Sequence, residues 1–199
     1  MRRTFFLLAI TLGGVAGGYS QGMLNFANAG VGVNAPIYLY TYTNNLTVPL
    51  TGPDYAAQLF YAAPGTGNSI SSYTPLSSVV PFQPPGFGAG YFLGGTTSIP
   101  GFAQGSTISI IVAAFSTAQG STWLESRSRG GAVGFGLPVS VTLVGGILPP
   151  PNLIGLQSFN LAPIDEPPTT LLLACGAGLF LLWKRGTWRR AVHNPGEQL

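Results

Sequence analysis

The sequence predicts a single all-β domain, a β-sandwich with a jelly-roll-like arrangement as its main variant, between two apolar terminal segments. Short runs with strand patterns fill residues 21–161, and the chain holds 29 glycines and 17 prolines to turn between them. No window before the C-terminal segment keeps a 3.6-residue period. Hydrophobic residues make up 46% of the chain and aromatic residues 12%, which is enough apolar surface to fold. Many short strands separated by Gly/Pro turns are typical of sandwiches.

Four segments carry the clearest strand patterns. Residues 36–43 alternate aliphatic or threonine side chains with tyrosines, residues 54–62 share one apolar face, and residues 139–144 alternate Val and Leu with Ser and Thr. Successive side chains of a strand point to opposite faces, so each segment presents one apolar face. Residues 106–115 are apolar on both faces and predict a central strand that is covered on both sides.

Shorter strands are predicted at residues 23–26, around Val79-Val80, at 91–93 and at 156–161. The segments between them are rich in Gly, Pro, Ser and Asn, which favour turns. We expect turns or loops at residues 52–54, 64–72, 81–90, 100–101, 123–131 and 149–151. Prolines cannot donate to a central ladder, so residues 81–90 are predicted as loop or edge. Residues 123–131 are predicted as an exposed loop, and the glycines of residues 131–136 as turns or bulges.

The charge pattern excludes one class of partner. Charged residues are only 7% of the chain, against about 25% in a typical soluble domain. Between residues 21 and 163 the formal charges are Asp54, Glu125, Arg127 and Arg129, which cancel. The net charge of +3 therefore comes from the two ends. Nucleic-acid binding needs clustered Lys and Arg on a folded face, so we expect no nucleic-acid partner.

The same region offers few catalytic groups. It lacks histidine and cysteine, since His193 and Cys175 both lie in the C-terminal segment. This excludes Ser-His-Asp and Cys-His arrangements, a zinc site with the usual ligands and an internal disulfide. Asp54 and Glu125 could form a glycosidase pair, but Asp54 stands in a Gly-Pro-Asp turn and Glu125 is expected to pair with a nearby arginine. We predict a non-enzymatic protein with no cofactor and no metal.

Residues 1–20 have the three parts of a secretory signal peptide. Arg2 and Arg3 form a positive start, residues 5–12 are apolar, and small residues follow up to Ser20. We expect cleavage after Ser20, with a site a few residues earlier as the alternative. An uncleaved anchor helix is disfavoured because the apolar stretch is short and broken by glycine.

Residues 162–190 form a second signal, with an acidic proline step, an apolar helix at residues 169–183 and a basic end. Its polar residues are Asp165, Glu166, Pro167 and Pro168 before the helix, and Lys184, Arg185, Arg189 and Arg190 after it. A helix over 169–183 would be roughly 22 Å long, against a hydrocarbon core of about 30 Å, so it is a marginal transmembrane anchor. The positive-inside rule places the tail, residues 191–199, in the cytoplasm and the domain outside.

This order of parts resembles the PEP-CTERM sorting domain of exported proteins of Gram-negative bacteria. Glu166 and Pro167 match the second and third positions of the family's Pro-Glu-Pro step, while Asp165 stands at the first. The resemblance implies processing near this step by a membrane enzyme called an exosortase. It also implies an inner-membrane intermediate that then moves to the cell envelope or extracellular space, with an exopolysaccharide as a further candidate partner. A plain type I single-pass membrane protein remains the alternative.

Aromatic side chains suggest one binding surface. Tyr38, Tyr40 and Tyr42 share one face of a predicted strand, and Trp123 lies near the charged residues, so together they could form a sugar-stacking platform. The alternative is that they form a layer of the core or a half-buried sheet face. The sequence thus favours an exported structural or adhesive protein of the cell envelope or extracellular matrix, with a carbohydrate-binding surface module as the alternative.

Overall fold

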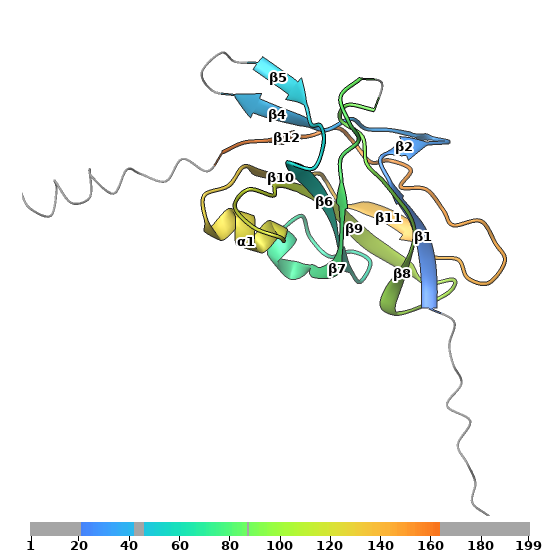
Figure 1. The fold of residues 1–199 in the computed structure, drawn as a ribbon. Helices are drawn as coiled ribbons and strands as arrows, with labels where there is room; N and C mark the ends of the chain where they lie inside the picture. Colours follow the sequence, from blue (N-terminus) through green and yellow to red (C-terminus); the bar gives the residue numbers. More distant parts are fainter. Residues whose placement is uncertain (1–20, 42–45, 87, 164–199) are drawn as a thin grey trace, which may run out of the picture.

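The computed structural model describes residues 21–41, 46–86 and 88–163, and this part of the chain is mostly β-structure (Figure 1). The predicted all-β fold is confirmed. Two short helical elements interrupt the strands in the described residues, the 3-10 turn η1 (Ile70–Ser72) and the helix α1 (Trp123–Ser128). The strands are β1 (Gln21–Ala27), β2 (Ala29–Gly30), β3 (Val33–Asn34), β4 (Tyr38–Thr41), β5 (Leu46–Pro49), β6 (Tyr55–Ala62), β7 (Thr74–Pro81), β8 (Leu93–Ala103), β9 (Thr107–Ser116), β10 (Val133–Phe135), β11 (Val139–Thr142) and β12 (Asn160–Leu161).

Strand β9 is the centre of a five-stranded sheet. The strand order is β10-β9-β6-β7. β11 pairs with the same edge of β9 as β10 does, but with the first half of β9, whereas β10 pairs with its last residues. β6 runs antiparallel to β9 over its whole length, whereas β10 and β11 share the opposite edge of β9. All residues of β9 except its two ends are buried. The prediction of a central strand that is apolar on both faces is therefore confirmed.

The two faces of this sheet pack into two separate apolar clusters. Leu59 of β6 and Ile110 of β9 belong to the larger one, here called the main core. Phe60 and Ile111, which follow them in the chain, belong to the smaller one, here called the second cluster. Because side chains alternate along a strand, each central strand contributes to both clusters.

The remaining strands surround the main core. β1 pairs with β8, β4 lies between β5 and β12, and β2 and β3 form a small hairpin. Two isolated bridges link the β1–β8 pair to the five-stranded sheet. Met23 of β1 pairs with Val144, just after β11, and Phe92, just before β8, pairs with Phe82, just after β7. The rings of Phe26 and Phe82 pack against Phe92, with centroid separations of 4.8 and 5.8 Å.

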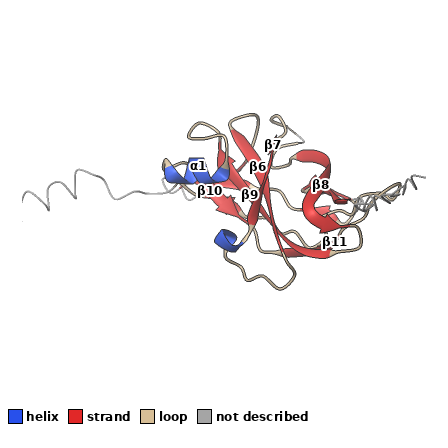
Figure 2. Cartoon of the chain, turned by 90° about the horizontal axis from the view of Figure 1, so that it is seen from below, coloured by secondary structure: helices blue, strands red, loops and turns tan. Residues whose placement is uncertain are grey.

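Helical segments cover the second cluster. Ile70 of η1, the following Tyr73 and Trp123 of α1 all pack there, and Figure 2 shows α1 beside β10 at one end of the sheet. The Tyr73 hydroxyl lies 2.8 Å from the Ser109 hydroxyl of β9 and donates to the Thr66 carbonyl at 3.2 Å. The second face of β9 is therefore closed by these two short elements rather than by another sheet.

The prediction of a turn at residues 100–101 is wrong. β8 continues through them, and its register with β1 jumps from Met23↔Ser98 to Gln21↔Ala103, so the segment is a bulge within a paired strand. Gly101 has a φ of 79°, which glycine adopts without strain. The strand predicted at residues 91–93 overlaps this longer strand only at Leu93.

The prediction of an exposed loop at residues 123–131 is also wrong. Residues 123–128 form α1, and Trp123 is only 2% exposed. Glu125, Arg127 and Arg129 remain exposed on the outer side of the segment. The helix forms because one large apolar side chain anchors it to the sheet while its charges face solvent.

Two further differences concern the end of the domain. The strand predicted at 156–161 shrinks to β12, which runs parallel to β4, and β5 and β10 were not predicted. Residues 1–20 and 164–199, with the predicted signal peptide, helix and sorting residues, lie outside the described residues, as does Tyr42. In the described part of the chain, no helix has the length and apolar character needed to cross a membrane.

Candidate functional site

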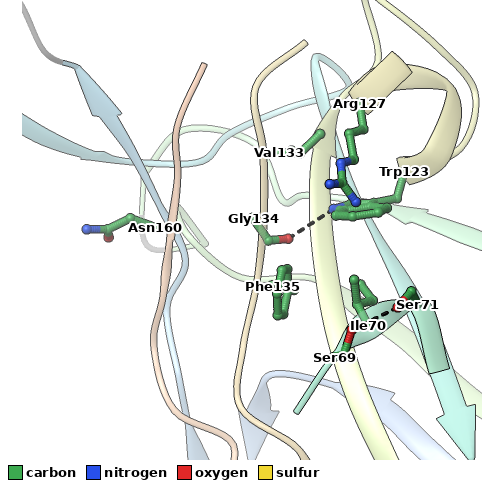
Figure 3. Close-up of a pocket in the computed structure, with 9 residues that line it drawn as sticks. All are labelled: Ser69, Ile70, Ser71, Trp123, Arg127, Val133, Gly134, Phe135 and Asn160. Atoms are coloured by element: carbon green, nitrogen blue, oxygen red, sulfur yellow. Dashed lines mark hydrogen bonds between the residues drawn. The ribbon is translucent and has the colours of Figure 1, made fainter. Parts of the chain in front are cut away.

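A groove of about 730 Å³ opens above the second cluster (Figure 3). Its wall is built from residues 69–71 around η1, Trp123 and Arg127 of α1, residues 133–135 of β10, and Asn160 of β12. Ile70, Trp123 and Val133 give it an apolar floor. Serine hydroxyls and one guanidinium line its rim. An apolar surface with a few convergent polar groups is the usual character of a ligand site.

Local capping interactions position α1. The Thr122 hydroxyl accepts from the backbone N–H of Glu125 at 3.2 Å. The Glu125 carboxylate in turn accepts from the N–H and the hydroxyl of Ser121, both at 2.9 Å. Such reciprocal bonds satisfy the N–H groups that a helix start leaves unpaired. The bonds from Ser121 also lower the pKa of Glu125, so this carboxylate is ionised and engaged at the helix start.

Trp123 is fixed in orientation by the sheet below it. Its backbone N–H donates to the side-chain oxygen of Gln58 at 3.0 Å, and its indole N–H donates to the carbonyl of Gly134 at 3.3 Å. Gln58, which is 3% exposed, also donates to the carbonyl of Leu76 at 2.8 Å. The rings of Phe60 and Phe135 meet Trp123 edge to face at 5.8 and 6.2 Å. These contacts hold the Trp123 side chain in place in the floor of the groove.

Arg127 lies over this floor. Its guanidinium carbon is 5.2 Å from the centre of the Trp123 ring, a cation–π arrangement that follows from the i, i+4 spacing of the two residues. Arg129, by contrast, donates to the carbonyl of Gln119 at 3.2 Å. Hydrogen bonds from Ser121 and, to a smaller extent, the charge of Arg129 lower the pKa of Glu125, so Arg129 is the arginine that interacts with this carboxylate. In the part of the chain that the structure describes, no oxygen accepts a hydrogen bond from the Arg127 guanidinium, which lies at the rim of the groove.

Close backbone approach forms the far wall. A Cβ on Gly134 would collide with the backbone oxygen of Asn160 and lie 3.1 Å from the Cα of Leu161. Glycine therefore lets β10 lie directly against β12, next to the bridge between Val133 and Ala162. The interpretation of Gly134 as a turn or bulge is wrong because it lies within β10.

The structure separates the predicted aromatic platform into two parts. Trp123 is in the floor, with Arg127 above its ring. Tyr38 and Tyr40 are half-buried on β4, facing away from the main core, since Ile37 and Leu39 of the same strand pack into that core. Asn160 of the groove is the register partner of Tyr38, so the two parts are neighbours across β12.

The two carboxylates of the domain, Asp54 and Glu125, are both exposed, as the sequence predicts. Asp54 is exposed in a turn, where its carbonyl accepts from the N–H of Thr117 at 2.9 Å. Burial, with a smaller effect from the Asp54 charge, raises the pKa of the adjacent Tyr55. Glu125 is occupied at the start of α1. In the residues that the structure describes, no three side chains of His, Cys, Asp or Glu gather as a metal site would require.

Sequence reasoning did not single out Arg127, Phe135 or Asn160 as site residues. Thr122 and Glu125 have the spacing of a capping box, and this signal would have identified the helix that brings Arg127 over Trp123. Phe135 and Asn160 carry no such local signal, because their proximity depends on how β10 and β12 meet.

Comparison of the chain with protein-family models, with curated proteins and with solved structures finds no match.

Proposed function

We propose that this protein is an exported, non-enzymatic β-sandwich of the cell envelope or extracellular matrix with a structural or adhesive role. In this proposal an N-terminal signal directs export, and the PEP-CTERM-like segment at residues 162–190 holds an inner-membrane intermediate until an exosortase-type enzyme removes it. The two layers of the sandwich are the five-stranded sheet and the strands that face it across the main core.

One observation carries the proposal. The described strands and helices form one folded unit around β9, and the two signal-like segments of the sequence lie on either side of it. Gln21 and Pro163 are both exposed, at well-separated places on the molecule (Figure 1), so processing enzymes could reach either end of the folded unit.

The distribution of charge supports a role outside catalysis. The described residues carry two exposed carboxylates, one in a turn and one held at a helix start, and a general acid–base pair needs groups free to exchange protons in a site. A domain with few charged side chains and a large apolar core is suited to a structural role rather than to catalysis. In this proposal the C-terminal segment, residues 162–190, determines where the folded unit is located.

Substitution in the proline step tests the sorting mechanism. In the native host, Glu166→Ala combined with Pro167→Ala should leave the C-terminal segment uncleaved and the protein in the inner membrane. Asp54→Ala, in a surface turn of the domain, is the control and should be processed normally. Normal processing and release of the double variant would contradict exosortase sorting and leave the plain single-pass anchor.

A second candidate function is carbohydrate binding at the outer face of β4. The observation that favours it is the alternation along this strand, which turns Tyr38 and Tyr40 away from the main core, half-buried rather than enclosed. Tyrosine rings in such a position present an apolar face on which a sugar ring can stack.

A further inference from the structure

We propose that the groove and the strip of surface beside it bind a carboxylate-bearing sugar chain, of the class of uronic-acid oligosaccharides. The proposal rests on the second candidate function and specifies its ligand. It does not depend on how the protein is sorted. It comes from a continuous outward face across β10, β12 and β4, with one cation at its end.

Strand register defines this face. Leu161 is fully buried and pairs with Leu39, which packs against the main core. The alternate pair, Asn160 and Tyr38, therefore points outward. The antiparallel bridge between Val133 and Ala162 places Phe135, two residues on, beside Asn160.

The resulting strip runs from Phe135 through Asn160 to Tyr38. Neighbouring strands lie about 4.8 Å apart, so the two aromatic side chains are about 10 Å from each other. Phe135 is 42% exposed, and Figure 3 shows the Asn160 side chain directed away from the groove residues. Aromatic rings flanking an amide across such a span match the alternating apolar and hydroxyl-bearing faces of a short oligosaccharide.

Arg127 makes the site selective for an acid. Its guanidinium is held over Trp123, and no carboxylate lines the groove. The nearest carboxylate on its own helix, that of Glu125, accepts two bonds from Ser121. The planar donors of an arginine match a carboxylate in bidentate geometry. A sugar carboxylate bound at the rim would accept hydrogen bonds from the Arg127 guanidinium.

The serines at the opposite rim supply hydroxyl recognition. The hydroxyls of Ser69 and Ser71 lie 2.8 Å apart. This single hydrogen bond uses one of their two protons, so one O–H and several lone pairs remain to meet sugar hydroxyls. A single cation with hydroxyls and aromatic rings fits an acidic sugar better than a nucleic acid, which needs clustered basic residues.

The test compares an acidic ligand with its neutral form. The full chain, purified in detergent, is titrated calorimetrically with an oligogalacturonate and with the same oligosaccharide as its methyl ester. We expect the acid to bind at least about tenfold more tightly than the ester, because the ester removes a charge-assisted hydrogen bond. Arg127→Gln should remove this preference, whereas Arg129→Gln, on the same helix but bonded to Gln119, should retain it.

Three outcomes decide the matter. Loss of the preference in Arg127→Gln, with weaker binding of both ligands in Phe135→Ala and Tyr38→Ala, supports the proposal. Equal binding of acid and ester that falls in Tyr38→Ala overturns the acidic specificity and leaves the tyrosine surface as a neutral-sugar site. Absence of binding to either ligand, in a chain whose thermal unfolding is cooperative, overturns both.

Discussion

At the scale of single residues, Gln58 is the polar group on which the second cluster depends. It is buried in β6 and bonds the carbonyl of Leu76 in one direction and the N–H of Trp123 in the other. Buried polar groups persist in a core only when they are satisfied in this way. One side chain thus ties the edge strand β7 and the helix α1 to β6.

Replacement of Gln58 by leucine should destabilise the fold by about 2–4 kcal/mol. Leucine has a similar volume but leaves a buried N–H and a buried carbonyl without partners, at about 1–3 kcal/mol each. Chemical denaturation monitored by circular dichroism measures the change. Gln157→Leu, at an exposed loop position, is the matched control and should change stability by less than about 0.5 kcal/mol. Equal stability of the two variants would refute the role given to Gln58.

Glu125 provides a pH-dependent prediction at the same scale. Hydrogen bonds from Ser121 lower its pKa in the folded state from the reference value of 4.5. Its contribution to stability is therefore complete above pH 4.5 and lost as the pH falls through the lowered folded pKa. The stability difference between the wild type and Glu125→Gln should be present at pH 7 and shrink in acid. A difference that does not vary between pH 7 and pH 3 would contradict the capping interaction.

At the scale of elements, the contact between β10 and β12 sets the shape of the groove. Gly134 allows this contact, because any Cβ there would meet the backbone of Asn160. Backbone atoms cannot rotate away as a flexible side chain can. The far wall of the groove therefore depends on one glycine.

Gly134→Ala should cost about 1–3 kcal/mol, the usual range for forced overpacking. It should also weaken any ligand binding in the groove, since separating the strands moves the carbonyl that holds Trp123. Thermal unfolding and the titration described above measure the two effects. Gly67→Ala is the control, because a Cβ at Gly67 meets nothing within 4 Å. A fully stable Gly134→Ala protein would show that the two strands are not held in close contact.

Elements with strong periodic patterns were predictable from the sequence, and those that depend on long-range packing were not. β9 and β11 were predicted with their buried faces, because alternation and a run that is apolar on both faces are local signals. β6 was predicted with one buried face, whereas Ala56, Gln58 and Phe60 on its other face are buried as well. β8 was predicted only at its first residue, Leu93, since the Pro100-Gly101 pair has the local sequence of a turn and becomes a bulge only through pairing with β1.

The candidate site was less predictable for the same reason. Trp123 and the tyrosines were selected as aromatic residues, but the sequence did not reveal that Trp123 is buried under Arg127. Its neighbours Phe135 and Asn160 come together only through the bridge that joins β10 to the end of the domain. A groove made from four separate segments has no contiguous sequence signature.

At the scale of the whole molecule, the protein divides into a folded unit and two predicted signals. The folded unit is organised around β9, with the main core on one face and the second cluster on the other. The segments predicted to direct export and sorting lie before and after this unit in the sequence. We propose that the cell removes both segments and delivers the intact unit.

The intact mass of the protein recovered from its native host shows whether both segments have been removed. We predict a mature chain that begins at Gln21, or within a few residues of it, and ends before Thr169, near the acidic proline step. The same mass should be found in the envelope or extracellular fraction. A chain that still carries Leu199 would contradict the account and identify the C-terminal segment as a permanent anchor.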